Sequence, residues 1–358
     1  MSNYRILILG ASYGSLLASK TLFGGHSVKL VCLPEEANLI NSEGIRVRLP
    51  VRGCAEPVEL DSRRLPGEVS ASGAMEVDPR EYDLIGLAMQ EPQYGSPGVR
   101  ELLDAIATSR VPCMSIMNMP PLAYMRRIPA VNAELLKSAY TAPDVWERFD
   151  LDRITLCSPD PQAIRPPAEK PNVLSVTLPT NFKVARFGDE RANEILRNLE
   201  KEIDAARFDT PEGKIELPVK LRFYDSIFVP LAKWAMLMAG NYRCITEDGM
   251  RTAKEAVHSD LAASRSIYDF VLKVCTKLGA SRDELVPFDK YAAAAQELSR
   301  PASAARALNN GALNIERADK LVQLAARQHG MNHRILDKVV ALVDQRLETN
   351  RRAKHAVA

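Results

Sequence analysis

Two stretches of the sequence carry residue types suited to chemistry, and the first is a turn near the N-terminus. The segment GASYGS at 10–15 follows the apolar run 4–9 and precedes the helix-like stretch 16–23. A helix that begins after such a turn presents unpaired backbone N–H groups and about half a positive charge, which suits a pyrophosphate. We therefore expect a dinucleotide to bind at Gly10, Ser12, Tyr13, Gly14 and Ser15.

The glycine pattern of this turn departs from the usual dinucleotide fingerprint. The spacing G-x-G-x-x-G would place glycines at positions 10, 12 and 15, where this chain has Gly10, Ser12 and Ser15. Gly14 replaces the third glycine if the turn is one residue shorter. The two serines either donate hydroxyl hydrogen bonds to the phosphates or hold the phosphates away through their Cβ atoms.

The second stretch is a lysine in an otherwise apolar helix, IFVPLAKWAMLMA. Burying a lone cation is costly unless it is paired or functional. A lysine whose pKa is lowered by burial can polarise a carbonyl oxygen and donate the proton that a forming alkoxide needs. The alternative is that Lys233 extends from the helix face into water. Asn241 follows two turns later and is expected on the same face.

The elements that must position these residues are short apolar strands alternating with helices, which is typical of a parallel sheet. Ligands of such a sheet bind at the carboxyl ends of its strands. Gln90 follows the strand expected at 82–89, and Asn118 follows the strand expected at 111–117. Both are candidate cofactor-binding residues, although a polar loop residue is the alternative for Gln90.

Two acidic residues follow the second expected strand, 28–33. Dinucleotide enzymes usually place an acid there for the adenosine ribose diol, or a basic residue for a 2′-phosphate. Glu35 and Glu36 either reach a ribose or cap the helix that runs to Ser42.

The sequence predicts an α/β protein with a Rossmann-type doubly wound sheet followed by a mostly α-helical domain. The dinucleotide-binding domain is expected at 1–218, with a proline-rich elaboration at about 120–180 that excludes long helices. The helical domain, for substrate binding and dimerisation, is expected at 219–358. Its first helix, 223–244, carries Lys233.

Composition excludes several classes of protein. A chain of 358 residues has room for two domains, and its net charge of +2 gives no reason to expect nucleic acid as a partner. No apolar run approaches the ~20 residues of a membrane span. Six cysteines without a CxxC pair indicate reduced thiols in the cytoplasm, and the five histidines form no metal-ligand cluster with them.

Four stretches together resemble the ketopantoate reductases (2-dehydropantoate 2-reductases), as a divergent member. They are ILGASYGSLLA, YDLIGLAMQEPQY, LAKWAMLMAGN and PASAARALNNGALNIERADKLVQLAARQHGMN. The resemblance covers most of the chain except about 120–180. It implies hydride transfer from NADP, with NAD as the alternative cofactor, to a small 2-oxo acid or a related carbonyl or imine. It also implies a homodimer.

The resemblance also implies roles for four residues of the helical domain. Lys233 matches the family's proton-donating lysine, and Asn241 matches an asparagine that positions substrate. Ser303 stands eight residues before Gly311, which is the spacing of the family serine that binds the substrate carboxylate. The family glutamate falls one residue before Glu316.

Several departures from the family indicate a substrate other than ketopantoate. Leu237 replaces a family asparagine, Gln90 replaces a lysine, and Leu33 or its neighbour replaces the arginine that selects NADP. Two alternatives stay open. One is an opine-type dehydrogenase, although His258 and Asp260 lie on different faces of their helix. The other is a nucleotide- or ligand-binding protein that has lost its chemistry.

Overall fold

The computed structural model describes residues 3–211 and 213–357, and the chain divides into two compact units. The first unit comprises 1–89, 93–124 and 144–227, and the second comprises 90–92, 125–143 and 228–358. The predicted boundary between 218 and 219 stays a prediction. The second unit takes in two short segments that precede that boundary.

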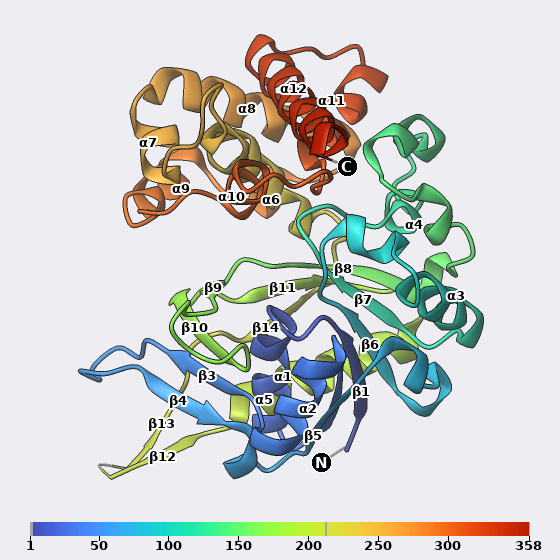
Figure 1. Cartoon of the computed structure of the whole chain (residues 1–358), viewed down its shortest axis with the longest axis vertical. Helices are drawn as coiled ribbons and strands as arrows, with labels where there is room; N and C mark the ends of the chain where they lie inside the picture. The colour runs from blue at the N-terminus through green and yellow to red at the C-terminus, as the bar shows by residue number, and fades with distance from the viewer. Residues whose placement is uncertain (1–2, 212, 358) are drawn as a thin grey trace. The chain divides into compact units, whose positions relative to one another are not determined.

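An eight-stranded sheet forms the centre of the first unit, with the order β14-β11-β8-β7-β6-β1-β2-β5 (Figure 1). Six of its strands, β5-β2-β1-β6-β7-β8, are parallel and follow the 3-2-1-4-5-6 order of dinucleotide-binding domains. This confirms the predicted Rossmann-type sheet. The strands are β1 (Arg5–Leu9), β2 (Ser27–Val31), β5 (Val69–Ser72), β6 (Leu84–Leu87), β7 (Cys113–Ile116), β8 (Ile154–Ser158), β11 (Phe182–Ala185) and β14 (Leu221–Tyr224).

A four-stranded sheet with the order β4-β3-β10-β9 lies on the other side of helix α1 (Gly14–Phe23), which contacts both β2 and β3. Every residue of α1 is buried, in keeping with a sequence that contains Lys20 as its one charged residue. The strands of this sheet are β3 (Arg46–Leu49), β4 (Val58–Asp61), β9 (Gln162–Ile164) and β10 (Val173–Leu178), and a hairpin pairs β12 (Phe208–Thr210) with β13 (Gly213–Ile215).

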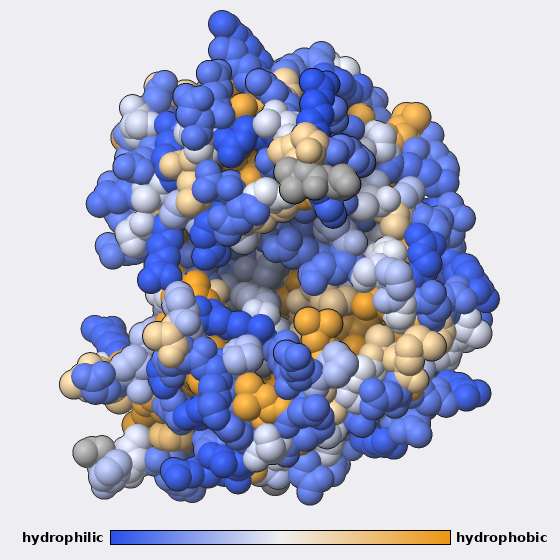
Figure 2. Space-filling view, in the orientation of Figure 1, coloured by the Kyte–Doolittle hydropathy of each residue, from blue (hydrophilic) through white to orange (hydrophobic). Residues whose placement is uncertain are grey.

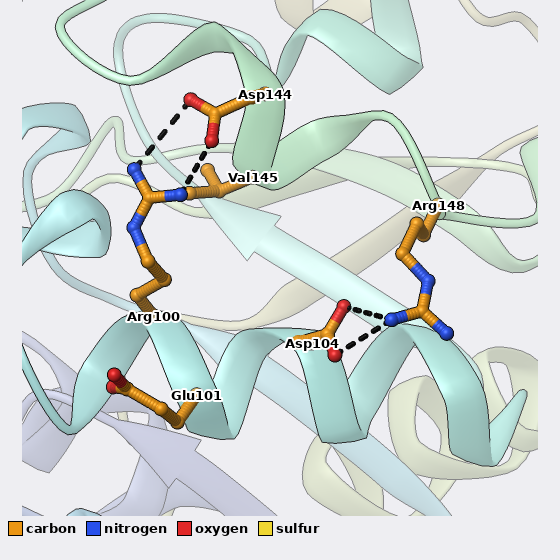
Figure 3. Close-up of a pocket in the computed structure, with 6 residues that line it drawn as sticks. All are labelled: Arg100, Glu101, Asp104, Asp144, Val145 and Arg148. Atoms are coloured by element: carbon orange, nitrogen blue, oxygen red, sulfur yellow. Dashed lines mark hydrogen bonds and ion pairs between the residues drawn. The ribbon is translucent and has the colours of Figure 1, made fainter.

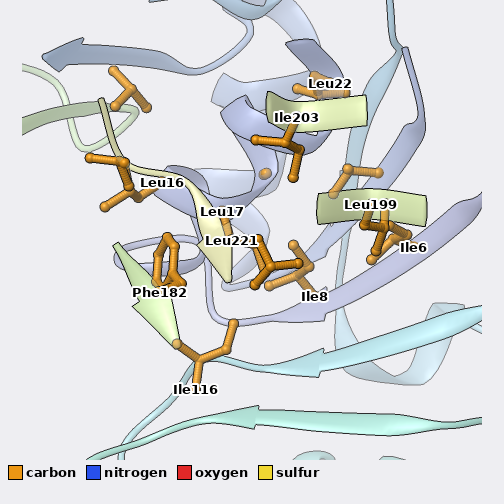
Figure 4. Packing of buried hydrophobic residues seen from close by; sticks show 14 of the residues in the cluster. Ile6, Ile8, Leu16, Leu17, Leu22, Ile116, Phe182, Leu199, Ile203 and Leu221 are labelled. Atoms are coloured by element: carbon orange, nitrogen blue, oxygen red, sulfur yellow. The ribbon is translucent and has the colours of Figure 1, made fainter. Parts of the chain in front are cut away.

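The core of the first unit packs α1 and α5 (Glu190–Ala205) against the central strands (Figure 4). Leu199 and Ile203 lie four residues apart on the buried face of α5 and meet Ile6 and Leu22 in this cluster. Because β1 pairs with strands on both sides, its residues from Ile6 onward are buried. The remaining helices near the sheet are α2 (Pro34–Glu43), α3 (Val99–Ser109) and α4 (Leu122–Met125).

The second unit is mostly helical, as predicted. Its helices are α6 (Lys233–Met236), α7 (Ala253–His258), α8 (Leu261–Leu278), α9 (Phe288–Ala295), α10 (Ser303–Asn309), α11 (Ala318–Gln328) and α12 (Arg334–Val357).

The single helix predicted over 223–244 is wrong in two respects. Its first residues belong to β14, which pairs with β11. The helical segment begins with the 3₁₀ turn Val229–Ala232, where Pro230 occupies the start. A proline is tolerated at that position because it has no N–H to leave unpaired. The segment then continues through α6, the π-helical turn Leu237–Asn241 and the 3₁₀ turn Tyr242–Cys244.

No helix among the described residues is long and apolar enough to cross a bilayer. Hydrophilic side chains cover most of the face shown in Figure 2, in agreement with a core made largely of buried aliphatic residues.

Candidate active site

The turn after β1 requires glycine at two positions. Gly10 has a φ of 100°, and a Cβ atom there would lie 2.7 Å from Cγ of Met89. A Cβ atom on Gly14 would lie 2.7 Å from Cγ2 of Ile8, so this glycine lets α1 approach the central strand. This close helix–strand packing is the property for which the third glycine of the usual fingerprint is required.

The two serines of this turn are in different environments. Ser12 is exposed, whereas the Ser15 hydroxyl is buried and donates to the carbonyl oxygen of Ala11. Tyr13 is the N-cap residue of α1, and no side chain within the described ranges caps this helix end. The N–H of Leu16 donates to the carbonyl oxygen of Tyr13 at 3.0 Å, so Gly14 and Ser15 carry the first-turn N–H groups that suit an anion, and Ser12 is the serine whose hydroxyl is accessible.

The Tyr13 side chain is held by contacts with other parts of the first unit. Its hydroxyl donates a 2.6 Å hydrogen bond to the carbonyl oxygen of Pro161, and its ring packs edge-on against Phe182. Burial raises the pKa of the Tyr13 hydroxyl well above its usual value, with Cys157 and Asp160 adding to the effect. Tyr13 contributes to the turn through its backbone and anchors it to the proline-rich region.

Asn118 and Gln90 follow neighbouring parallel strands. Asn118 comes two residues after β7 and is half-buried between the buried Met117 and Met119, so its side chain is the accessible one at this strand end. Gln90 comes three residues after β6, is exposed, and falls in the second unit. Within the first unit, the structure thus places the glycine turn and Asn118 at carboxyl ends of the same sheet.

Lys233 and Asn241 lie on the accessible side of a buried helical segment. From Leu231 to Ile245, every residue is buried except Lys233, Met236 and Asn241, which are half-buried. Eight residues of regular α-helix turn about 80° beyond two full turns, which would separate the two side chains. The π turn takes up about one extra residue, which brings the rotation within about 20° of two turns.

The π turn is held by packing within the second unit. It contacts α7, α8, α10 and α11. The Tyr291 hydroxyl donates a 3.1 Å hydrogen bond to the carbonyl oxygen of Met236. A Cβ atom on Gly240 would lie 2.0 Å from that hydroxyl oxygen. Leu237, which replaces a family asparagine, is 1% exposed and so faces away from the accessible side. Met236 occupies that side, and the sequence pattern gave no signal for it.

Ser303 and Glu316 belong to elements packed around the same turn. Ser303 is the exposed first residue of α10, and α10 contacts the π turn. The Tyr242 hydroxyl donates to the carbonyl oxygen of Glu316 and accepts a 3.0 Å hydrogen bond from the N–H of Ala318. Because Tyr242 follows Asn241 directly, the backbone at Glu316 lies beside the end of the π turn. The Glu316 residue is 8% exposed.

A charged surface pocket lies elsewhere, on α3 and the 3₁₀ turn Pro143–Trp146 (Figure 3). It has a volume of about 440 Å³, and two ion pairs, Arg100 with Asp144 and Arg148 with Asp104, occupy it. None of the residues predicted to bind cofactor or substrate lines this pocket. Both of its arginines are paired with aspartates, and its third carboxylate, Glu101, accepts from the N–H of Gly98, so we place the candidate site on the residues described above.

Comparison with solved structures finds similar folds, whereas comparison of sequences finds no match. No protein-family model and no curated protein sequence matches the chain. Among solved structures, 2-dehydropantoate 2-reductase from Methylococcus capsulatus is similar with a TM-score of 0.63 at 14% identity, covering 97% of each chain. A ketopantoate reductase from Ralstonia eutropha JMP134 has a TM-score of 0.61 at 13% identity, covering 97% of this chain and 99% of its own.

A third similar structure is D-mandelate dehydrogenase in complex with NADH, with a TM-score of 0.60 at 13% identity over 96% of this chain and 99% of its own. The fold of the chain is therefore that of the ketopantoate reductases and of D-mandelate dehydrogenase. This confirms, at the level of the fold, the resemblance carried by the four sequence stretches.

Proposed function

We propose that the chain is an NAD(P)-dependent oxidoreductase that reduces a small 2-oxo acid, or a related carbonyl or imine. The observation that carries this proposal is the accessible face formed by Lys233, Met236 and Asn241 on a helical segment that is otherwise buried. A lysine and an amide on one face are suited to a polar substrate that must accept a proton. The similar structures are those of two reductases and a dehydrogenase.

The residues of the first unit fit a dinucleotide. Gly10 has a positive φ, and Gly14 packs closely against β1. Neither glycine has a side chain that would cover the backbone of the turn, and α1 begins there without a side-chain cap among the described residues. We assign the pyrophosphate to the N–H groups of this turn and to the Ser12 hydroxyl. Asn118 would contact the nicotinamide half of the cofactor. The bound cofactor would supply the hydride.

The residues of the second unit would hold the substrate and move the proton. Lys233 Nζ would hydrogen-bond the carbonyl oxygen, polarise it, and donate a proton to the developing alkoxide. The Asn241 amide would orient the same substrate carbonyl group from a neighbouring position on the accessible face. Ser303 would donate to the substrate carboxylate, and Glu316 would accept from a donor on the substrate or on Lys233.

The opine-type alternative is less well supported by the geometry. His258 contacts the carbonyl oxygen of Ala292 at 3.0 Å through Nε2 and the Gln296 amide at 3.1 Å through Nδ1. Asp260 caps α8 by accepting from the N–H of Ala263 at 2.9 Å. Each of the two side chains has a structural role of its own, so they do not form a catalytic pair.

Nucleotide titration tests the proposal. The purified protein would be titrated with NADH and with NADPH while its thermal unfolding is followed. A nucleotide present at 100 times its dissociation constant should add about 2.7 kcal/mol to the free energy of unfolding. Stabilisation by at least one nucleotide is expected, and no shift with either would contradict the proposal. Stabilisation without turnover of any 2-oxo acid or imine would favour the non-catalytic binding protein.

We further propose that the enzyme is a cytoplasmic homodimer. A dimeric ketopantoate reductase from Staphylococcus aureus has the same fold, with a TM-score of 0.60 at 11% identity. Sedimentation equilibrium should give twice the chain mass of 39.6 kDa. A mass equal to one chain would contradict the dimer and leave the proposed activity standing.

A further inference from the structure

The carboxyl end of β2 is the place where a Rossmann-type domain distinguishes NAD from NADP. Here β2 ends at Val31 and α2 begins at Pro34. Leu33, the N-cap residue of α2, is 75% exposed and supplies no charge for a 2′-phosphate. Glu36 follows one turn later, and its side chain is only 15% exposed. The position expected to hold an arginine therefore carries an exposed apolar side chain beside a carboxylate.

An arginine from a distant part of the sequence does reach the carboxyl end of β2. Arg165 directly follows β9 in the proline-rich region, and its Nη2 donates to Oε1 of Glu36. The segment 159–165 that carries Arg165 has a second anchor in the hydrogen bond between the Tyr13 hydroxyl and the carbonyl oxygen of Pro161. The segment therefore contacts both the glycine turn that follows β1 and the first turn of α2, and all three lie within the first unit.

The charges at this place favour a ribose diol over a phosphate. Arg165 is neutralised by its ion pair with Glu36, and Glu35 adds an exposed negative charge in the same helix turn. Burial, followed by the charge of Glu36, raises the pKa of the Cys32 thiol to about 12, so this neighbour stays neutral. A dianionic 2′-phosphate would have to displace the Glu36 carboxylate from Arg165 and lie next to that negative charge. The hydroxyl groups of an unmodified ribose would instead donate hydrogen bonds to the Glu36 carboxylate.

We propose, on the basis of the function proposed above, that Glu36 accepts hydrogen bonds from the 2′- and 3′-hydroxyls of the adenosine ribose and thereby selects NADH over NADPH. Arg165 is a positioning residue that fixes the Glu36 carboxylate. The exposed Leu33 side chain offers an apolar surface to the adenine. This reverses the preference for NADP implied by the sequence resemblance, because the arginine on which that preference depends is absent.

The experiment measures dissociation constants for NADH, NADPH, ADP-ribose and 2′-phospho-ADP-ribose by calorimetry. ADP-ribose and its 2′-phosphate lack nicotinamide, so they report on the adenosine half alone. The wild type is expected to bind NADH and ADP-ribose at least tenfold more tightly than their 2′-phosphorylated forms. Glu36→Gln should weaken NADH binding by about tenfold, as for the loss of a hydrogen bond to a charged group, and should reduce the discrimination.

Arg165→Met should weaken NADH binding severalfold, and Arg165→Lys should recover part of the loss because a cation again holds Glu36. Lys170→Met is the matched control. Lys170 pairs with Glu43 at the opposite end of α2, so its removal breaks a similar ion pair without touching the proposed ribose contact. It should leave all four dissociation constants unchanged.

Tighter binding of NADPH by the wild type, lost in Arg165→Met, would overturn the inference and make Arg165 a phosphate ligand, while the proposed oxidoreductase function would stand. Equal binding of both nucleotides by the wild type would also overturn it. Failure to bind any of the four ligands would contradict the proposed function itself.

Discussion

The hydroxyl oxygen of Tyr291 occupies the space that a Cβ atom on Gly240 would need, at a distance of 2.0 Å. The same hydroxyl donates to the carbonyl oxygen of Met236, one residue before the π turn begins. This contact fixes the turn that places Asn241 on the same side as Lys233. Gly240 is thus required by packing, in a helix where glycine otherwise lowers stability.

Gly240→Ala is expected to lower the free energy of unfolding by about 1–3 kcal/mol, as for overpacking of a core. Adding Tyr291→Phe should restore part of the loss, because the next atom, Cζ of the ring, lies 3.3 Å from the new methyl group. Urea denaturation of the two variants measures this. Gly249→Ala is the control, since its Cβ would come no nearer than 3.9 Å to another residue. A fully stable Gly240→Ala would contradict the packing described here.

Ser12 and Ser15 should respond differently to replacement by alanine. Ser12→Ala is expected to weaken nucleotide binding severalfold with an unchanged melting temperature, because the hydroxyl is exposed. Ser15→Ala should instead lower stability by about 1 kcal/mol, because its hydroxyl is buried against the carbonyl oxygen of Ala11. Calorimetric titration and thermal unfolding of both variants separate the two effects. The opposite pattern would show that Ser15 is the phosphate ligand.

Lys20 predicts a pH dependence of stability. Its side chain is buried in α1, with Nζ 3.0 Å from the carbonyl oxygen of Pro218. Burial, followed by repulsion from Lys220, lowers its pKa from 10.5 to about 7. Between these two values the unfolded chain binds a proton that the folded chain does not, so stability rises with pH across this window, by on the order of 1.4 kcal/mol per pH unit.

Lys20→Met should remove this contribution. The free energy of unfolding of the variant minus that of the wild type should therefore fall as the pH rises from 7 to 9. Taking the difference cancels the contributions of other titrating groups. Lys201→Met, at an exposed position of α5, should show a pH-independent difference. An equally pH-independent difference for Lys20→Met would mean that Lys20 stays protonated in the folded chain.

The sequence predicted the sheet because its central strands are short apolar runs, and residues such as Ile6 to Leu9 are buried on both faces. It predicted the glycine turn because only glycine adopts the backbone at position 10 without strain. It missed β5, Val69–Ser72, because two of its four residues are serines and the strand depends on pairing with β2.

Other features of the site depend on tertiary contacts that a local pattern does not contain. The π turn is a response to packing around Gly240, and a regular helix through the same residues would rotate Asn241 about 80° away from the face of Lys233. The contact between Arg165 and Glu36 joins residues 129 positions apart in the chain. The sequence leaves two roles for Glu36, ribose contact or helix capping, and only the contact with Arg165 favours the first.

The central claim is that the Lys233 side chain transfers a proton to substrate while a separate part of the chain binds the nucleotide. The direct measurement compares Lys233→Met with Lys273→Met, an exposed lysine of α8, in nucleotide binding and in turnover of 2-oxo acids that include ketopantoate and phenylglyoxylate. Lys233→Met should lose turnover by about 100-fold or more, with the dissociation constant for NADH unchanged within about twofold. Turnover equal to that of Lys273→Met would contradict the account.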